Sequence, residues 1–180
     1  MKKYIFILLA VVMLLFSSCI VKNKGSEVVE DETIVYERDS AIVVACRMMS
    51  NDSTEEALFI LDSLGVTYPN YPLIPFLHGF AHQINGDSCK ATPQYWKSIQ
   101  MYDSMMAVCS KTSTAINRAY CFLFMNGEEV FRQCLDSIKQ TSYFKKDSVS
   151  LDLLYELERD SLFKSMLEEF KHNALSRRTE

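Results

Sequence analysis

The sequence predicts an all-α protein. From about Thr33 onwards, apolar residues recur at steps of three and four, which places them on one face of successive helices. The five glycines and four prolines interrupt these periodic stretches. No stretch alternates apolar and polar residues cleanly enough to indicate a strand. The length fits one domain with a sizeable core.

The first element, residues 1–18, has the pattern of a secretory signal peptide. Two lysines precede an apolar run that ends at Phe16, which is too short for a membrane span, and two serines lead to Cys19. Residues 15–19, Leu-Phe-Ser-Ser-Cys, resemble a bacterial lipobox. This resemblance implies a lipoprotein in which Cys19 is diacylated and becomes the mature N-terminus. An ordinary signal peptide with an incidental cysteine is the alternative.

Residues 19–32 are expected to form a flexible lipid tether, because they are mixed in character and increasingly acidic. Ile20 directly follows Cys19, at the place where an aspartate would resemble a signal for retention in the inner membrane. Location in the outer membrane, facing the periplasm, is therefore expected. Removal of the signal takes away two of nineteen basic residues and none of the twenty-three acidic ones, which leaves a formal charge of −6. Without a cationic cluster, nucleic acid is excluded as a partner.

The second element, residues 33–180, contains one eight-residue sequence motif three times, at residues 57–64, 98–105 and 131–138, and we call it the repeated phrase. In each copy, positions one, five and eight share one helical face, and an Asp-Ser pair at positions six and seven faces solvent or ends a turn. The copies begin 41 and 33 residues apart. The second spacing is close to the roughly 34 residues of a tetratricopeptide unit, and the first matches it if residues 86–92 are a seven-residue insertion before Pro93 in a helix's first turn.

The chain resembles the tetratricopeptide repeat family beyond this period. That family has a small residue where paired helices touch and a turn residue seven positions later. The corresponding pairs in this sequence are Ala45 with Asp52, Gly79 with Gly86 and, with a slip of one residue, Ala119 with Asn126. The resemblance implies about three helical hairpins over residues 38–142, in a right-handed superhelical solenoid. An irregular helical bundle is the alternative, because the tryptophan and one closing proline of the family pattern are missing.

The last element, from about residue 146, is expected to be a capping helix pair. Residues 151–170 resemble the helical ending that often follows such repeats, and a solenoid needs its final apolar face covered. The apolar stripe of this segment consists of Leu162, Phe163, Met166, Leu167 and Phe170. A detachable amphipathic helix that binds a partner or a membrane is the alternative.

The family resemblance also implies a partner groove on the concave face, lined by the first helix of each hairpin. The residues expected there are apolar and aromatic, which suits an extended peptide or an amphipathic helix. A groove already filled by the protein's own C-terminal helices is the alternative. The candidate groove residues are Met49, Phe76, Phe80, Gln83, Tyr120 and Phe124, accompanied by Ile42, Cys46, Leu73 and Ile116.

Catalytic and metal sites find little support in the residue patterns. His78 and His82 have the four-residue spacing of paired metal ligands, but no third ligand is evident, so no metal and no cofactor are expected. The glutamate pairs that begin at Glu55 and Glu128 are typical of helix starts. There is no nucleophile elbow and no phosphate-binding glycine loop. The protein is therefore expected not to be an enzyme and to have no small-molecule substrate.

The five cysteines after Cys19 are an odd number, so they cannot all pair within one chain. Most lie in apolar helical patterns and are expected as buried thiols, although one or two disulfides stay open. Cys89 is expected to be the most exposed. The cysteines concerned are Cys46, Cys89, Cys109, Cys121 and Cys134.

Together these patterns predict a non-catalytic, lipid-anchored helical-repeat protein of the bacterial periplasm. Its expected work is protein–protein interaction, as an adaptor or assembly factor for an envelope complex. The alternative is an immunity lipoprotein that neutralises an antibacterial toxin, which its small size, acidic charge and membrane tether also fit.

Overall fold

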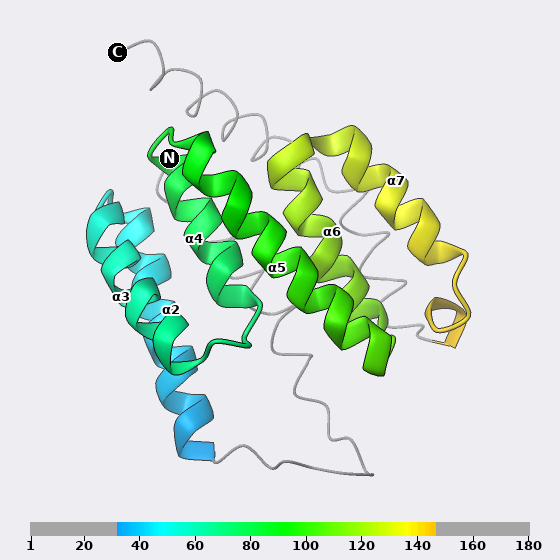
Figure 1. The fold of residues 1–180 in the computed structure, drawn as a ribbon, viewed down its shortest axis with the longest axis horizontal. Helices are drawn as coiled ribbons and strands as arrows, with labels where there is room; N and C mark the ends of the chain where they lie inside the picture. The colour runs from blue at the N-terminus through cyan, green and yellow to red at the C-terminus, as the bar shows by residue number, and fades with distance from the viewer. Residues whose placement is uncertain (1–31, 147–180) are drawn as a thin grey trace.

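The computed structural model describes residues 32–146, which form six α-helices and a short 3₁₀ turn (Figure 1). The expected all-α class is confirmed for this part of the chain, where no sheet occurs. None of the described helices is both long and apolar enough to span a membrane. The elements are α2 (Glu32–Ser50), α3 (Thr54–Thr67), α4 (Leu73–Ile84), α5 (Ser88–Val108), α6 (Thr112–Asn126), α7 (Glu128–Lys139) and η2 (Phe144–Lys146).

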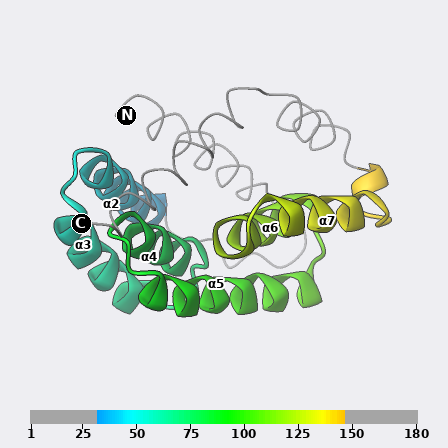
Figure 2. The same ribbon diagram turned by 90° about the horizontal axis from the view of Figure 1, so that it is seen from above.

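Each helix packs against the next one in sequence, in antiparallel pairs. The pairs are α2 with α3, α4 with α5 and α6 with α7, and α5 also packs against α6. Figure 2 shows α5 lying beneath both α4 and α6. The signal peptide, Cys19, nearly all of the tether and the capping segment lie outside the described residues.

The repeated phrase falls on the second helix of each pair: α3, α5 and α7. Its positions one, five and eight are buried in the first and third copies, as predicted from their shared helical face. All three Asp-Ser pairs are exposed, as expected. The second copy departs from the prediction at its last position, because Met105 is 41% exposed. Met105 lies in the last turn of α5, which ends at Val108.

The turns inside the pairs use left-handed or extended positive-φ residues. Asp52 and Gly86 adopt φ of 63° and 78°, at the two positions that the repeat pattern predicted. In the third pair the turn residue is Gly127, with φ 93° and ψ −178°, rather than Asn126. That conformation is almost exclusive to glycine. The turn residue of the third pair is therefore Gly127, eight positions after Ala119 rather than seven.

The predicted insertion before α5 is wrong in its details. Residues 88–92 are not loop but the first turns of α5, so Pro93 lies inside the helix and not in its first turn. Asp87 starts the helix early, because its side chain accepts a hydrogen bond from the Lys90 backbone N–H at 3.1 Å. Pro93 has no backbone N–H to donate inside the helix. This loss is tolerated in α5, which is at least about two turns longer than α3 and α7, the second helices of the other pairs.

The α4 and α5 helices make a tight contact at Gly79. A Cβ atom at this position would lie 2.8 Å from the Tyr95 ring and 3.1 Å from the Ala91 carbonyl oxygen. Glycine therefore lets the two backbones approach. The two residues that hold the equivalent place in the other pairs, Ala45 and Ala119, are small and buried, as expected for points of helix contact.

The glutamate pairs take the predicted places. Glu55 and its neighbour lie in the first turn of α3, and Glu128 and its neighbour lie in the first turn of α7. Negative charge is favourable there because the N-terminal end of a helix carries partial positive charge.

Candidate functional site

The candidate groove residues come from α2, α4 and α6, but the described structure buries most of them. Only Gln83 is half-buried; the other five are at most 7% exposed. Among them, the rings of Phe76 and Phe80 pack against the ring of Phe124. Its ring centroid lies 5.6 Å from that of Phe76, 5.3 Å from that of Phe80 and 6.3 Å from that of Tyr95. Phe76, Phe80 and Phe124 therefore belong to the core between α4, α5 and α6, while Tyr120 packs against Phe131 of α7.

Gln83 joins these three helices by hydrogen bonds. Its amide nitrogen donates to the carbonyl oxygen of Phe124 at 2.9 Å, and its amide oxygen accepts from the Tyr95 hydroxyl at 2.6 Å. The accompanying residues Ile42, Cys46, Leu73 and Ile116 are also buried. The C-terminal helices that the filled-groove alternative invoked lie outside the described residues.

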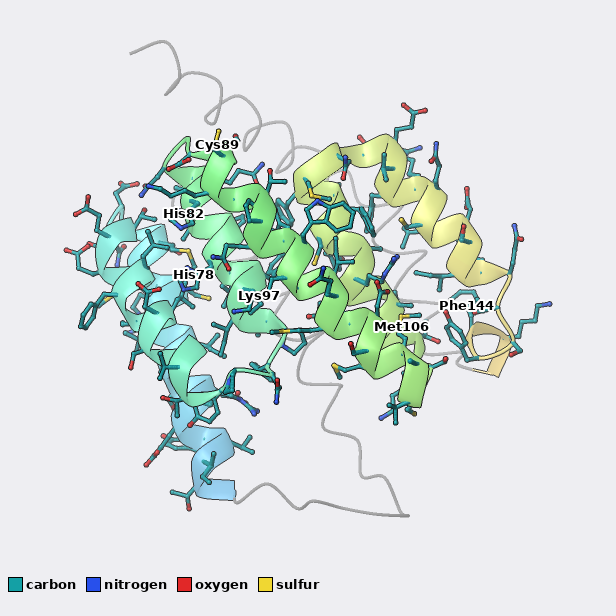
Figure 3. The ribbon with its side chains drawn as sticks, viewed as in Figure 1. His78, His82, Cys89, Lys97, Met106 and Phe144 are labelled. Atoms are coloured by element: carbon teal, nitrogen blue, oxygen red, sulfur yellow. The ribbon has the colours of Figure 1, made fainter. Side chains whose placement is uncertain are left out.

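A different surface on the second-helix side gathers side chains suited to binding. Its residues come from α5, α6 and α7, and we call it the α5–α7 groove; Figure 1 shows α6 lying between α5 and α7. Part of it is a cavity of about 330 Å³. The cavity is lined by Met106, Ala115, Arg118, Val130, Gln133, Cys134, Ser137, Ile138, Thr141 and Tyr143. Figure 3 shows Met106 near the end of α5 and Phe144 in η2, below α7.

An aromatic cluster continues this groove away from the cavity. Trp96 of α5 is 47% exposed and meets the Phe122 ring edge-on, with 6.0 Å between centroids. Arg118 lines the cavity, and its guanidinium carbon lies 4.9 Å from the Phe122 ring centroid. Arg118 also forms an ion pair with Asp103. Trp96, Phe122 and Arg118 thus form a series of contacts that ends at the cavity.

Sequence reasoning missed this groove. Trp96 is the single tryptophan of the chain and lies just before a repeat copy, on a position that helical periodicity leaves outside the buried face. A single tryptophan on an outward-facing helix position was the feature of the sequence that could have indicated this groove. The contribution of α7 could not be read from sequence, because it depends on how far apart the second helices of adjacent pairs lie.

A second cavity, of about 450 Å³, lies where the end of α5 meets the start of α6 and the connection from α3 to α4. We call it the methionine cavity. It is largely apolar and is bordered by Val108, which is 90% exposed. Its lining residues are Asn70, Met101, Ser104, Met105, Val108, Cys109, Lys111 and Thr114.

The two histidines of α4 lie beside each other, with ring centroids 6.1 Å apart (Figure 3). His78 is buried, and its Nε2 lies 3.4 Å from a carboxylate oxygen of Asp62 on α3. Within residues 32–146, no group of three or more His, Cys, Asp or Glu side chains is arranged to hold a metal ion. The Asp62 carboxylate, from the first repeat copy, instead links α3 to α4.

Burial lowers the pKa of His78 and of His82. For His78, the negative charge of Asp62 opposes this effect, while the positive charges of His82 and of Lys97 on α5 reinforce it. A histidine in the unfolded chain titrates near pH 6.5. The unfolded chain therefore takes up protons that the folded chain resists, and stability falls as the pH drops through about 6.5.

We therefore expect the urea midpoint of unfolding to be lower at pH 5.5 than at pH 7.5, and the difference to shrink in His78→Gln. Glutamine has no charge at either pH, so the burial of a titrating group at position 78 no longer opposes folding in acid. His82→Gln, at the more exposed position, should shrink the difference less. An equal acid loss in wild type and His78→Gln would contradict this assignment.

All five described cysteines are free thiols in the structure. Cys46 and Cys121 are buried, as expected, and burial raises the pKa of each to about 12, so both thiols stay protonated. Cys89 is exposed, as expected, but on α5 rather than in a loop. Cys109 is exposed as well, against the expectation of a buried residue, because α5 ends there.

No protein-family model, curated protein sequence or solved structure matches this chain.

Proposed function

We propose that this chain is a lipid-anchored helical-repeat protein that binds a resident protein of the bacterial envelope, as an adaptor or assembly factor. The lipobox-like residues before Cys19 support a tether to the outer membrane on its periplasmic side. The protein then works by contact and not by catalysis. The partner binds in the α5–α7 groove.

The helix pairs are best explained as tetratricopeptide-like repeats in a right-handed solenoid. Three observations support this assignment: the repeated phrase on the second helix of each pair, the small residue where paired helices touch, and the positive-φ turn seven or eight residues later. The capping role expected for the segment from about residue 146 is part of the same proposal. Such solenoids present extended surfaces to other proteins.

The observation that carries the binding proposal is the half-exposed Trp96, packed edge-on against Phe122 and joined through Arg118 to a cavity. Tryptophan and arginine are the side chains most enriched among residues that dominate binding energy. Because Arg118 lines the cavity, a partner's apolar side chain could be enclosed there while a neighbouring part of the partner contacts Trp96. The buried concave residues offer no such exposed anchor.

Capture from the native envelope with Trp96→Ala tests this proposal. The variant should weaken binding by about 2 kcal/mol, roughly thirty-fold in Kd, if Trp96 is a binding anchor. Phe59→Ala is the matched control, because Phe59 is an aromatic residue that is 76% exposed on the distant helix α3. It should capture the same partner as the wild type does.

Two results would contradict this proposal, the first its binding site and the second its adaptor function. Equal loss of the partner in the Trp96→Ala and Phe59→Ala variants would exclude the α5–α7 groove. Capture of a secreted toxin from competitor cells, and of no envelope protein, would support the immunity function instead.

A further inference from the structure

We propose that the methionine cavity is a binding site for one medium-chain fatty acid, with its carboxylate at Lys111 and its alkyl chain against residues of α5. The cavity volume of about 450 Å³ lies within the usual range of small-ligand sites, about 300–1,000 Å³. The site is separate from the α5–α7 groove and does not depend on the proposed envelope partner.

One wall of the cavity is an apolar strip on the last two turns of α5. Met101, Met105 and Val108 are spaced by four and three residues, so they lie on one helix face. The strip runs about 10 Å along the helix axis. Methionine side chains are flexible and adapt to apolar neighbours of irregular shape. An alkyl chain along this strip covers Val108, which is otherwise 90% exposed.

A positive charge lies at the Val108 end of the strip. Lys111 follows Val108 by three residues, in the connection from α5 to α6, and is the only charged residue among those that line the cavity. It is half-buried and forms no ion pair within residues 32–146. Asp103, the nearest acidic residue in the sequence, is ion-paired with Arg118. The Lys111 ammonium group is therefore available to an anion.

The start of α6 adds positive potential at the same end of the cavity. Lys111 directly precedes α6, and its side chain makes no capping hydrogen bond to the first turn. The N-terminal end of a helix carries partial positive charge, because its first N–H groups lack partners within the helix. Thr114, in this first turn, lines the cavity. A carboxylate beside Lys111 is thus attracted by the helix end as well.

The scarcity of hydrogen-bonding groups in the lining favours a fatty acid over a peptide. Besides Lys111 and the Cys109 thiol, the polar side chains of the lining are those of Asn70, Ser104 and Thr114. A peptide brings backbone amides into the cavity, and each buried amide needs a hydrogen-bond partner. An alkyl chain needs none. The ammonium group of Lys111 repels cations, so a metal ion does not fit.

The same helix supplies a matched control for charge. Lys97 is an exposed lysine of α5 that does not line the cavity (Figure 3). Lys97→Gln and Lys111→Gln therefore change the net charge of the chain equally, whereas Lys111→Arg keeps the positive charge at the cavity. Met105→Glu places a carboxylate in the apolar strip at a position that is 41% exposed, where folding tolerates a charge.

The test is calorimetric titration of the full chain with decanoate, below the concentration at which decanoate forms micelles. Wild type should bind one equivalent. Lys111→Gln and Met105→Glu should each weaken binding by about tenfold or more, because the first removes a charge-assisted contact and the second repels the ligand. Lys111→Arg and Lys97→Gln should bind like wild type. Circular dichroism verifies that each variant keeps its helices.

NMR spectra of the methionine methyl groups supply a second readout. Decanoate should shift the signals of Met101 and Met105 and leave that of Met106, which lines the α5–α7 cavity, unchanged. No binding by wild type, equal binding by wild type and Lys111→Gln, or an equal loss in Lys97→Gln would each overturn the proposal. Tighter binding of an acetylated peptide that ends in leucine would overturn it too, since the cavity would then be a peptide site.

Discussion

Phe76→Ala should lower the free energy of unfolding by about 3–5 kcal/mol, the usual cost of truncating a fully buried phenylalanine. The Phe76 ring packs between Tyr95 of α5 and Phe124 of α6, at centroid distances of 5.8 and 5.6 Å. Alanine removes both contacts and leaves a cavity where α4, α5 and α6 meet. Urea unfolding followed by circular dichroism measures the effect.

The control is Phe59→Ala, which removes the same ring from an exposed position on α3. Its free energy of unfolding should change by no more than about 0.5 kcal/mol. If Phe76→Ala instead left stability unchanged and abolished partner binding, the concave groove predicted from sequence would be open, and the buried aromatic core described above would be wrong.

Gly79→Ala should lower the free energy of unfolding by about 1–3 kcal/mol, the usual cost of overpacking. Alanine normally stabilises a helix interior relative to glycine, so the expected sign is unusual. The reason is the close approach of α4 and α5. The new methyl group would overlap the Tyr95 ring, whose hydroxyl is held by Gln83, and would press on the Ala91 backbone oxygen.

Gly65→Ala is the matched control for this substitution. Gly65 also lies inside a helix, α3, but a Cβ atom there would meet only Ile74 Cγ2 at an ordinary 3.8 Å. That variant should be stabilised by about 0.5–1 kcal/mol. Thermal unfolding of both variants should therefore move in opposite directions, and a shift of Gly79→Ala towards higher temperature would contradict the tight contact.

Helical class and pairing could be predicted because they depend on local periodicity. The phrase that contains Leu61, Tyr102 and Leu135 places one buried residue at the same point of three helices. Asp52 and Gly86 were identifiable as turn residues from their spacing behind a small residue. These features follow from short-range geometry, which a sequence displays directly.

Features that depend on the fit between helices could not be predicted in the same way. Apolar residues such as Phe80 and Phe124 suit a partner groove and a core equally well, and only the position of α5 with Tyr95 assigns them to the core. The early start of α5 depends on one side-chain hydrogen bond from Asp87. Met105 and Cys109 are exposed at the C-terminal end of α5, and the sequence pattern alone did not locate that end.

Site-specific photocrosslinking in the native envelope tests partner binding in the α5–α7 groove most directly. A photoreactive residue replaces Trp96 in one variant and Phe59 in another, so both probes are exposed on second helices but lie on different pairs. The proposal predicts that light joins one envelope protein to the chain through position 96 and not through position 59. Crosslinking of the same partner only through position 59, or through neither position, would contradict binding in this groove.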